Sequence, residues 1–529
     1  MTPKMGRRRW AALLAVPLAA ALAACGSSTP SDQPAGSTAS GPAGSAPAGA
    51  SGARIVIGQA GDAQSLDPAS DTSAQAGNYD AMIFDRLLVR TDDGKFVPAL
   101  ATKWTQENPT TWVFDLRKDV KFSDGTGLTA ADVAFSFNRQ IERTMQNSVN
   151  VAPYFNKVTA DGDYQVKITS KAPLGTFLNR VAAVFIVPQH AVEKMGDDAF
   201  GKNPIGSGPY TLESWTTNSD FVAKANPAYW GGAAKNAEVE YKIVPEASSR
   251  VAALVSGQID IALGLPVESA QQLGSNPAVD VVDTPTNRVL MFGIQTTKGG
   301  PLANAKVRQA INYAVDKKAL LGMMGDAASL ANMDGKSLMY GKSIFGYDSS
   351  IADYPYDLDK AKKLLSEAGY DGTPIEIDAP RNQWPNDSAI AEAIGPMLDK
   401  AGIKTKINIE EWSSYRAKLV GGKATGLWMY AMGNPLGDAE YYFNIVLSSK
   451  GRGYFATPEY DKQIADQGQI TDPAKRLPVV QSMTKNFIEN EAPWLFLWNQ
   501  VDLNAKAKSV NGLSIDLDGL IDVRELTKS

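Results

Sequence analysis

The hydrophobic positions in the body of the chain recur with two periods, one typical of strands and one typical of helices. Residues 55–58 form a short apolar run, and residues 111–117 place apolar side chains at alternate positions. Two further strand-like runs, 87–91 and 95–99, flank Asp-Asp-Gly at 92–94, a sequence typical of a tight turn. We therefore expect strands in the first part of the body, two of them joined as a hairpin.

Helical stripes dominate the later part of the body. Apolar residues fall at helical spacing over 307–320, 361–368 and 390–398, and the first stripe runs without a break. Gly369 directly follows the second stripe, where it suits a helix C-cap. Residues 403–409 follow the third stripe as an alternating strand. Because helices and strands alternate, the pattern predicts an α/β body.

The amino-terminal segment has the layout of an export signal. Four positive charges precede an uncharged run at 10–24, which is shorter than the roughly 20 apolar residues that span a bilayer. The chain's single cysteine, Cys25, follows directly, so residues 1–24 look like a bacterial lipoprotein signal peptide with Cys25 as the lipidated residue. The alternative is an ordinary signal with a coincidental cysteine. Residues 25–52, rich in Ser, Gly, Ala and Pro, are then expected to form a flexible tether.

Composition excludes several classes of function. The formal net charge is −5 and no basic stripe is present, which argues against binding to nucleic acid. The chain has one histidine, His190, so it offers neither the His of a hydrolytic triad beside a nucleophile nor a typical zinc ligand set. We therefore expect no catalytic residues, no metal site and no cofactor. Residues 53–529 exceed one ordinary domain, which suggests two or three.

Ordered blocks along the body carry a family resemblance. They include Pro-Ile-Gly-Ser-Gly-Pro-Tyr at 204–210, Asn-Pro-Ala-Tyr-Trp-Gly-Gly at 226–232 and Leu-Val-Ser-Gly-Gln-Ile-Asp-Ile at 254–261. The remaining blocks are residues 84–104, 114–136 and 307–316. In these blocks and their order the chain resembles the extracellular solute-binding proteins of family 5, which serve peptide, opine, nickel and oligosaccharide ABC importers. The resemblance covers essentially the whole body.

This resemblance implies an α/β, type II periplasmic-binding-protein fold. Two lobes would close on a ligand in the cleft between them, and an extra domain would be attached. Lobe I would comprise residues 53–88, 206–285 and 498–529, the extra domain residues 89–205, and lobe II residues 286–497.

The resemblance also implies a binding protein rather than an enzyme. We expect an extracytoplasmic lipoprotein, monomeric and anchored to the cell membrane by lipid, that captures peptides or peptide-like solutes by lobe closure. It would deliver them to an ABC permease with its ATPase. A receptor for an opine, a glutathione-like solute, a sugar or a chelated metal is the alternative. A surface adhesin or folding helper on the same fold also stays open.

Family members that bind peptides use a carboxylate for the peptide amine and often an arginine for its carboxylate. Asp438, in Gly-Asp-Ala at 437–439, matches the acid of one family variant, and Arg381 lies in a matching Arg-x-x-x-Pro-Asn run. Both chemistries are sound, because a buried amine needs a partner and a guanidinium offers two parallel donors to a carboxylate. Trp412, Trp428 and Tyr430 are expected to line side-chain pockets. The alternatives are a helix cap for Asp438, a surface ion pair for Arg381 and core packing for the aromatic residues.

Overall fold

The computed structural model of the protein describes residues 51–323, 331–332, 340–381 and 383–529. The predicted signal peptide, Cys25 and all but the end of the predicted tether lie outside these residues. In the described part of the chain, no helix has both the length and the apolar character needed to cross a membrane.

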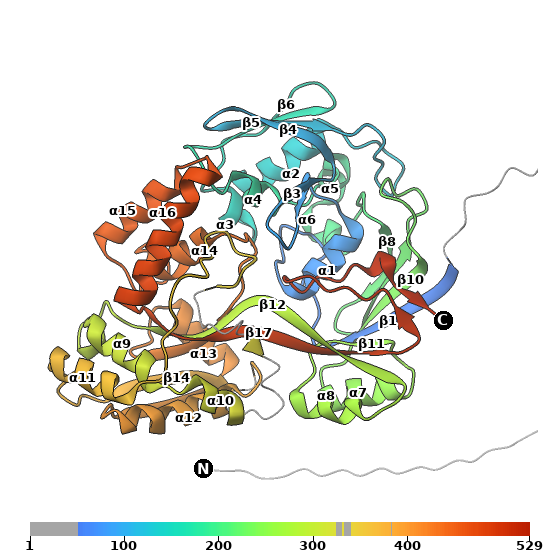
Figure 1. Cartoon of the computed structure of the whole chain (residues 1–529). Coiled ribbons are helices and arrows are strands. Elements are labelled where there is room, and N and C mark those ends of the chain that lie inside the picture. Colours follow the sequence, from blue (N-terminus) through green and yellow to red (C-terminus); the bar gives the residue numbers. More distant parts are fainter. Residues whose placement is uncertain (1–50, 324–330, 333–339, 382) are drawn as a thin grey trace, which may run out of the picture. The chain divides into compact units, whose positions relative to one another are not determined.

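One large mixed sheet organises the fold (Figure 1). The short strand β13 (Ala331–Asn332) pairs with it off the main path, beside β17. From one edge to the other, the strands are β15 (Thr405–Glu411), β14 (Ile375–Arg381), β16 (Leu427–Met432), β12 (Val279–Ile294), β17 (Trp494–Ala507), β11 (Ile261–Ala262), β1 (Ser51–Gln59), β10 (Asn236–Ile243), β9 (Asp220–Ala225) and β8 (Tyr210–Thr216).

The long strands β12 and β17 join the two halves of this sheet. They pair antiparallel along their length, and Figure 1 shows them side by side as they cross the molecule. The pairing is irregular between Pro285 and Val289 and again between Leu290 and Met291. This irregularity falls at the predicted boundary between lobe I and lobe II, residues 285 and 286. An interrupted ladder bends more readily than a regular one, so this segment is where we expect the predicted lobes to hinge.

The predicted lobe I contains the half of the sheet that runs from β11 to β8. Its first helix, α1 (Ala74–Ile83), begins at Ser73, whose hydroxyl accepts the backbone N–H of Ala76. The ring of Tyr79 on α1 stacks on Phe221 of β9, with 4.0 Å between ring centroids. Helices α7 (Ala247–Val255) and α8 (Val267–Gly274) and the paired strands β18 (Val510–Asn511) and β19 (Thr527–Lys528) complete this part.

The predicted extra domain has a sheet and a hydrophobic core of its own. The core includes Phe114, Phe137 and Phe155. The expected hairpin is confirmed, because β2 and β3 pair antiparallel around the turn that contains Gly94. The elements are β2 (Leu88–Arg90), β3 (Phe96–Pro98), β4 (Ala101–Asn108), β5 (Thr111–Leu116), α2 (Ala130–Glu142), α3 (Ser148–Val151), β6 (Thr159–Ala160), β7 (Gln165–Thr169), α4 (Phe177–Val181), α5 (Gln189–Met195) and α6 (Asp197–Phe200).

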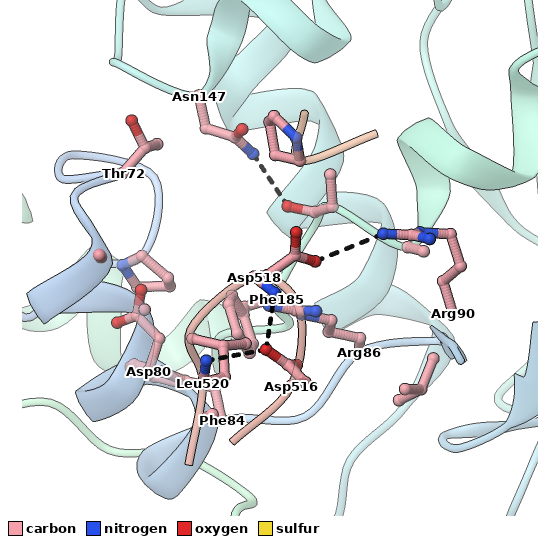
Figure 2. A pocket seen from close by; sticks show the side chains of 18 of the residues that line it. Thr72, Asp80, Phe84, Arg86, Arg90, Asn147, Phe185, Asp516, Asp518 and Leu520 are labelled. Atoms are coloured by element: carbon pink, nitrogen blue, oxygen red, sulfur yellow. Dashed lines mark hydrogen bonds and ion pairs between the residues drawn. The ribbon is translucent and has the colours of Figure 1, made fainter. Parts of the chain in front are cut away.

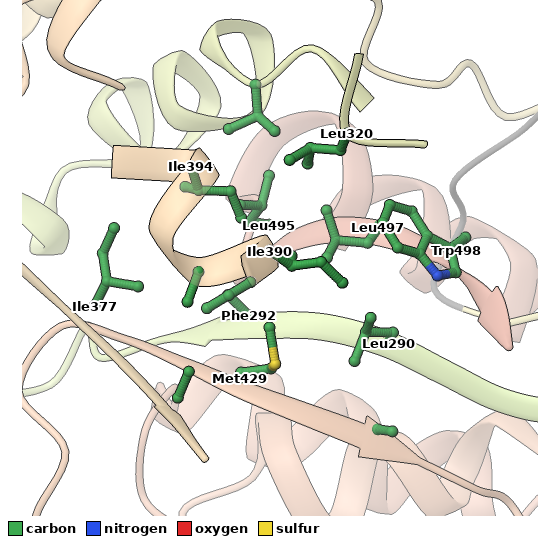
Figure 3. Packing of buried hydrophobic residues seen from close by; sticks show 14 of the residues in the cluster. Leu290, Phe292, Leu320, Ile377, Ile390, Ile394, Met429, Leu495, Leu497 and Trp498 are labelled. Atoms are coloured by element: carbon green, nitrogen blue, oxygen red, sulfur yellow. The ribbon is translucent and has the colours of Figure 1, made fainter. Parts of the chain in front are cut away.

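In the predicted lobe II, helices pack around the other half of the sheet. Figure 3 shows Ile390 and Ile394 of one of them beside Phe292 of β12 and Leu495 of β17, in one buried cluster. The helices are α9 (Ala305–Ala314), α10 (Lys317–Met323), α11 (Leu358–Ala368), α12 (Asp387–Lys400), α13 (Trp412–Val420), α14 (Ala439–Tyr442), α15 (Pro458–Gly468) and α16 (Pro473–Asn486). Short 3₁₀ turns lie at Pro301–Ala303 and Val523–Glu525, and short π-helical turns at Phe443–Leu447 and Phe487–Glu491.

Two details of lobe II test the helix predictions. Gly369 ends α11 in the left-handed conformation, with φ of 63°, as predicted. The unbroken helix predicted over 307–320 is wrong, because Val315 is extended and separates α9 from α10. The carboxylate of Asp316 then accepts the N–H of Ala319 at 2.9 Å, which stabilises a new helix start.

Close backbone packing explains the Gly-Ser-Gly sequence at 206–208. A Cβ atom on Gly206 would lie 1.9 Å from the carbonyl oxygen of Ile83, and one on Gly208 would lie 2.5 Å from that of Met82. No other residue fits at such distances. The intervening Ser207 is buried and donates a hydrogen bond to Asp85 at 2.8 Å. This close packing fixes the end of α1 against residues 206–208, where the chain is predicted to return to lobe I.

Candidate functional site

A cavity of about 1110 Å³ lies where the predicted lobe I, extra domain and lobe II meet. Ligand pockets usually occupy about 300–1,000 Å³, so this cavity is large enough for an extended small molecule. Its walls come from α1 and the chain around it, from residues 146–185 of the extra domain, from residues 433–445 of lobe II and from the carboxy-terminal residues 514–524. Asn287 and Arg288, in the irregular part of β12, also line it.

Many charged side chains along the wall are held by neighbours. Asp85 accepts hydrogen bonds from Ser207, Tyr229 and Trp230 at 2.8–2.9 Å. Burial raises the pKa of Asp85, and these neutral donors oppose the rise. Asp522 pairs with Arg524 at 3.2 Å. These contacts occupy all or part of the hydrogen-bonding capacity of the groups concerned.

The carboxy-terminal loop presents two more carboxylates, which Figure 2 shows with their partners. Asp516 accepts the backbone N–H groups of Asp518 and Leu520 at 2.9 and 2.8 Å. Burial, and next the charge of Asp518, raise the pKa of Asp516 to about 6, although the N–H of Leu520 opposes this. Asp518 itself pairs with Arg90 at 3.4 Å and accepts a hydrogen bond from Asn287. Through Asn287 the loop contacts the irregular part of β12.

Asp80 and Arg86 differ from the other charged groups of the wall. Asp80 lies in the last turns of α1 and is 3% exposed, and burial raises the pKa of its carboxyl well above the usual value. Arg86 places its guanidinium carbon 4.0 Å from the centre of the Phe185 ring. Burial lowers the pKa of Arg86, while the charges of Asp518, Asp80 and Asp516 raise it. Neither side chain forms a hydrogen bond or an ion pair with any residue that the structure describes.

The extra domain and lobe II meet beside the cavity through buried polar contacts. Arg180 of α4 pairs with Glu440 of α14 at 3.1 Å, and both side chains are less than 5% exposed. The side-chain amide of Asn179 donates to the carbonyl oxygen of Leu436 at 2.6 Å. The guanidinium of Arg90 packs so closely on Gly437 that a Cβ atom there would lie 2.3 Å from its Cζ. These contacts close one side of the cavity.

The structure gives Asp438 an internal role, as the helix-cap alternative anticipated. Its side chain is 2% exposed and accepts the backbone N–H of Glu440 at 2.9 Å at the start of α14. Both its oxygens also accept hydrogen bonds from Arg476, at 2.5 and 2.8 Å. Asp438 is not among the residues that line the cavity. A ligand contact by Asp438 stays a prediction.

The other four predicted site residues also lie outside the cavity lining. Arg381 is exposed at the end of β14 and lies 3.5 Å from Glu411. Trp428 is fully buried in the core, whereas Trp412 and Tyr430 are partly buried. Trp412 and Tyr430 both form edge contacts with the ring of Trp384, 5.4 and 5.5 Å between centroids. Their roles toward a ligand stay predictions.

Sequence reasoning missed Asp80 and Arg86. One signal was present, because Asp80 shares a helical face with the buried residues Ala76, Tyr79 and Ile83. A carboxylate on the apolar face of a helix needs an explanation, and burial without a partner is a common mark of a functional group. Among the described residues, no group of three His, Cys, Asp or Glu side chains could hold a metal ion.

Comparisons with known proteins agree with this architecture. A family model described as "Bacterial extracellular solute-binding proteins, family 5 Middle" matches residues 95–454. The probable D,D-dipeptide-binding periplasmic protein DdpA of Escherichia coli K12 is 29% identical over 497 residues, covering 90% of this chain and 94% of that protein. Heme-binding protein A of Haemophilus influenzae is 30% identical over 451 residues, covering 78% of this chain and 81% of that protein.

A solved structure supports the fold. DppA of Helicobacter pylori, an ABC transporter-associated periplasmic binding protein in complex with the peptide STSA, superposes with a TM-score of 0.75 at 22% identity. The superposition covers 90% of this chain and 98% of that one. The type II periplasmic-binding-protein fold expected from the sequence is confirmed, with a large mixed sheet and helices on it.

Proposed function

Because the chain belongs to the bacterial extracellular solute-binding proteins of family 5, we propose that it captures peptides or peptide-like solutes outside the cytoplasm for an ABC importer. The family consists of substrate-binding transport proteins rather than enzymes. The relatives named above are described as binding a D,D-dipeptide and heme, and the superposed structure holds a short peptide. The receptor would hand its solute to the permease subunits, which their ATPase drives.

One observation carries the proposal for this chain. The cavity of about 1110 Å³ is built from three parts of the fold and lies directly against the irregular segment of β12. A ligand in that position contacts both sides of the hinge at once. Such a ligand favours the closed arrangement, because only there does it meet every wall. Bending at the hinge would then open the cavity and release the solute.

The contacts beside the cavity suit this cycle. The Arg180–Glu440 pair and the contact of Arg90 with Gly437 join segments that are far apart in the sequence. They would form when the parts close and break when they open. A pair that must be resolvated at each opening contributes little net stability, but it sets the closed geometry.

The membrane attachment is also a proposal. The sequence before the body supports lipidation of Cys25 and release of residues 1–24, which would hold a monomeric receptor at the outer face of the cell membrane. Metabolic labelling with a fatty-acid analogue checks this point. Label on the wild-type chain and none on Cys25→Ala is expected, whereas label on both variants would contradict it.

Native mass spectrometry of the full chain in detergent, purified without added ligand, tests the function. A set of co-purified short peptides is the expected result. A single non-peptide mass would contradict peptide capture and favour a receptor for an opine, a glutathione-like solute, a sugar or a chelated metal.

A further inference from the structure

Residues 514–522 form a strap between α1 and the irregular part of β12. On the side of α1, the side-chain oxygen of Asn78 accepts the backbone N–H of Ile521 at 2.9 Å. The side-chain nitrogen of the same residue lies 3.4 Å from the carbonyl oxygen of Gly519 and donates to it. On the side of β12, the strap contacts Asn287. The strap therefore joins a helix of the predicted lobe I to the segment where the predicted lobes are expected to hinge.

The backbone of Asn287 bonds outside the ladder between β12 and β17. The residue lies in the irregular stretch of that ladder and is 3% exposed. Its N–H donates to the carbonyl oxygen of Leu517 in the strap at 3.0 Å. Its carbonyl oxygen accepts a hydrogen bond from the hydroxyl of Tyr442 on α14 at 3.3 Å. Buried backbone groups require partners, and here one partner belongs to the predicted lobe I and the other to the predicted lobe II.

The side chain of Asn287 also bonds to both sides. Its Nδ2 donates to the carboxylate of Asp518 in the strap and to the carbonyl oxygen of Asn434, the latter at 3.4 Å. Its Oδ1 accepts the backbone N–H of Asn434, also at 3.4 Å. An amide supplies donors and an acceptor from one end of a side chain, whereas a carboxylate of the same shape supplies acceptors alone. The contacts therefore depend on an amide at this position.

The neighbours of Asn287 in the irregular stretch bond differently. The hydroxyl of Thr286 donates to the carbonyl oxygen of Gln500 at 2.8 Å, and Arg288 pairs with Asp502. Both partners lie on β17, the strand with which β12 already pairs. These contacts fasten the two long strands to each other. Asn287 instead fastens the irregular stretch to the strap and to residues 434–442.

These contacts reach the cavity and the adjoining network. Asn287, Asn434 and Asp518 all line the cavity, so a bound solute can contact the residues that join the two sides. The side chain of Asn434 also donates to the carbonyl oxygen of Asp438 at 2.8 Å, at the start of α14. The pair between lobe II and the extra domain is formed from that helix. Two sites are coupled when both bias an element that has more than one arrangement, and a hinge is such an element.

We propose that Asn287 is the positioning residue that couples an occupied cavity to the angle between the predicted lobes. Its amide and backbone hold the strap and Asn434 at the spacing found in this structure. A solute in the cavity favours the same spacing, because it contacts the same residues. The inference rests on the proposed function and deepens it, since it names the contacts through which capture of a solute reaches the hinge.

The distance between the two edge strands of the large sheet tests this role. Spin labels at Glu213→Cys on β8 and Lys406→Cys on β15, both exposed, report it by electron–electron resonance in the full chain in detergent. Cys25→Ser in every variant confines the labels to these positions. Trialanine is the probe solute, and we expect it to shorten and narrow the distance distribution.

Asn287→Asp removes the amide donors and places a carboxylate beside that of Asp518. The free variant should show a longer, broader distance distribution, and its affinity for trialanine should fall by about tenfold. Adding Asp518→Asn exchanges donor and acceptor at this hydrogen bond, so the double variant should recover the distance and most of the affinity. Asn287→Ala adds no charge and gives the same readout where thermal melts show that Asn287→Asp is unfolded.

Asn504→Asp is the matched control. Asn504 lies on β17 and is 4% exposed, but it bonds to Thr284 and Gly264, which both belong to the predicted lobe I. This variant should melt at a lower temperature with an unchanged label distance. Wild-type distances in folded Asn287→Asp and Asn287→Ala, or a double variant as open as Asn287→Asp, would overturn the inference. Failure of the wild type to bind trialanine would contradict the peptide proposal, while the distances in the free variants still decide the role of Asn287.

Discussion

Arg476 donates hydrogen bonds to both carboxylate oxygens of Asp438, at 2.5 and 2.8 Å, and both side chains are 2% exposed. The same guanidinium lies 3.3 Å from Glu440, which in turn pairs with Arg180 of the extra domain. Four charges thus alternate in sign through the core beside the cavity. Asp438 belongs to this network, and its capacity for hydrogen bonds is used within the protein.

Removing the charge of Asp438 should therefore damage the fold before it damages binding. Asp438→Asn leaves Arg476 buried beside one carboxylate fewer, and breaking a buried pair in this way typically costs about 3–5 kcal/mol. Denaturant unfolding should show a loss of that order, while trialanine affinity of the folded fraction changes little. Unchanged stability with a large loss of affinity would instead place Asp438 at the ligand, as its sequence context suggests.

The pair between Arg180 and Glu440 should control closure. We expect Arg180→Met and Glu440→Gln each to lower ligand affinity several-fold without removing any ligand contact. A double-mutant cycle on affinity should give a coupling of about 1–2 kcal/mol, because the two groups act as one contact. Small-angle X-ray scattering of the free protein should show a larger radius of gyration in both variants. If the two substitutions have additive effects on ligand affinity and leave the radius of gyration unchanged, the Arg180–Glu440 pair does not control closure.

The stability of the free protein should fall as the pH rises through the titration of Asp516. Its folded pKa is about 6, above the value of roughly 3.9 in an unfolded chain. Between those values the folded state binds more protons than the unfolded state, so stability is highest below about pH 4 for this group and declines toward pH 7. We expect a loss of about 1 kcal/mol, since Asp516 keeps some solvent contact. Asp516→Asn should flatten this part of the profile in thermal melts at pH 4–7.

The buried carboxyl of Asp80 should carry a cost to stability when it is ionised. Burial raises the folded pKa of Asp80 well above the ordinary value. As for Asp516, the folded state then holds the proton more strongly than the unfolded state, and ionisation of the carboxyl opposes folding. Asp80→Asn removes that charge with nearly the same shape. At pH values where Asp80 is ionised, the free Asp80→Asn protein should be more stable than the wild type, because the variant no longer buries a charge that lacks a hydrogen-bond partner. A clear loss of stability would show that Asp80 has a structural partner.

Gly206→Ala should destabilise the protein strongly. The added methyl group would overlap the carbonyl oxygen of Ile83, and overpacking of this kind costs about 1–3 kcal/mol or more. Gly127→Ala is the matched control, since nothing lies within 4 Å of a Cβ atom there and its φ is not positive. Equal melting temperatures for the two variants would contradict the close packing of α1 on this segment.

Local patterns in the sequence anticipated much of the fold, because they depend on neighbours within one element. The hairpin around Gly94 and the cap at Gly369 follow from backbone conformations that glycine alone adopts easily. The break at Val315 was missed, since its apolar side chain continues the helical stripe.

The candidate site was harder to predict than the fold. Asp438 pairs with Arg476, which lies 38 positions away in the sequence. The burial of Asp80 likewise arises only in the tertiary structure.

A crystal structure of the protein with bound trialanine tests the account most directly. We predict that the peptide lies in the cavity lined by residues 433–445 and 514–524 and by α1. The Arg476–Asp438 pair should remain intact. A peptide outside this cavity, with its amine on Asp438 and Arg476 displaced, would contradict the account.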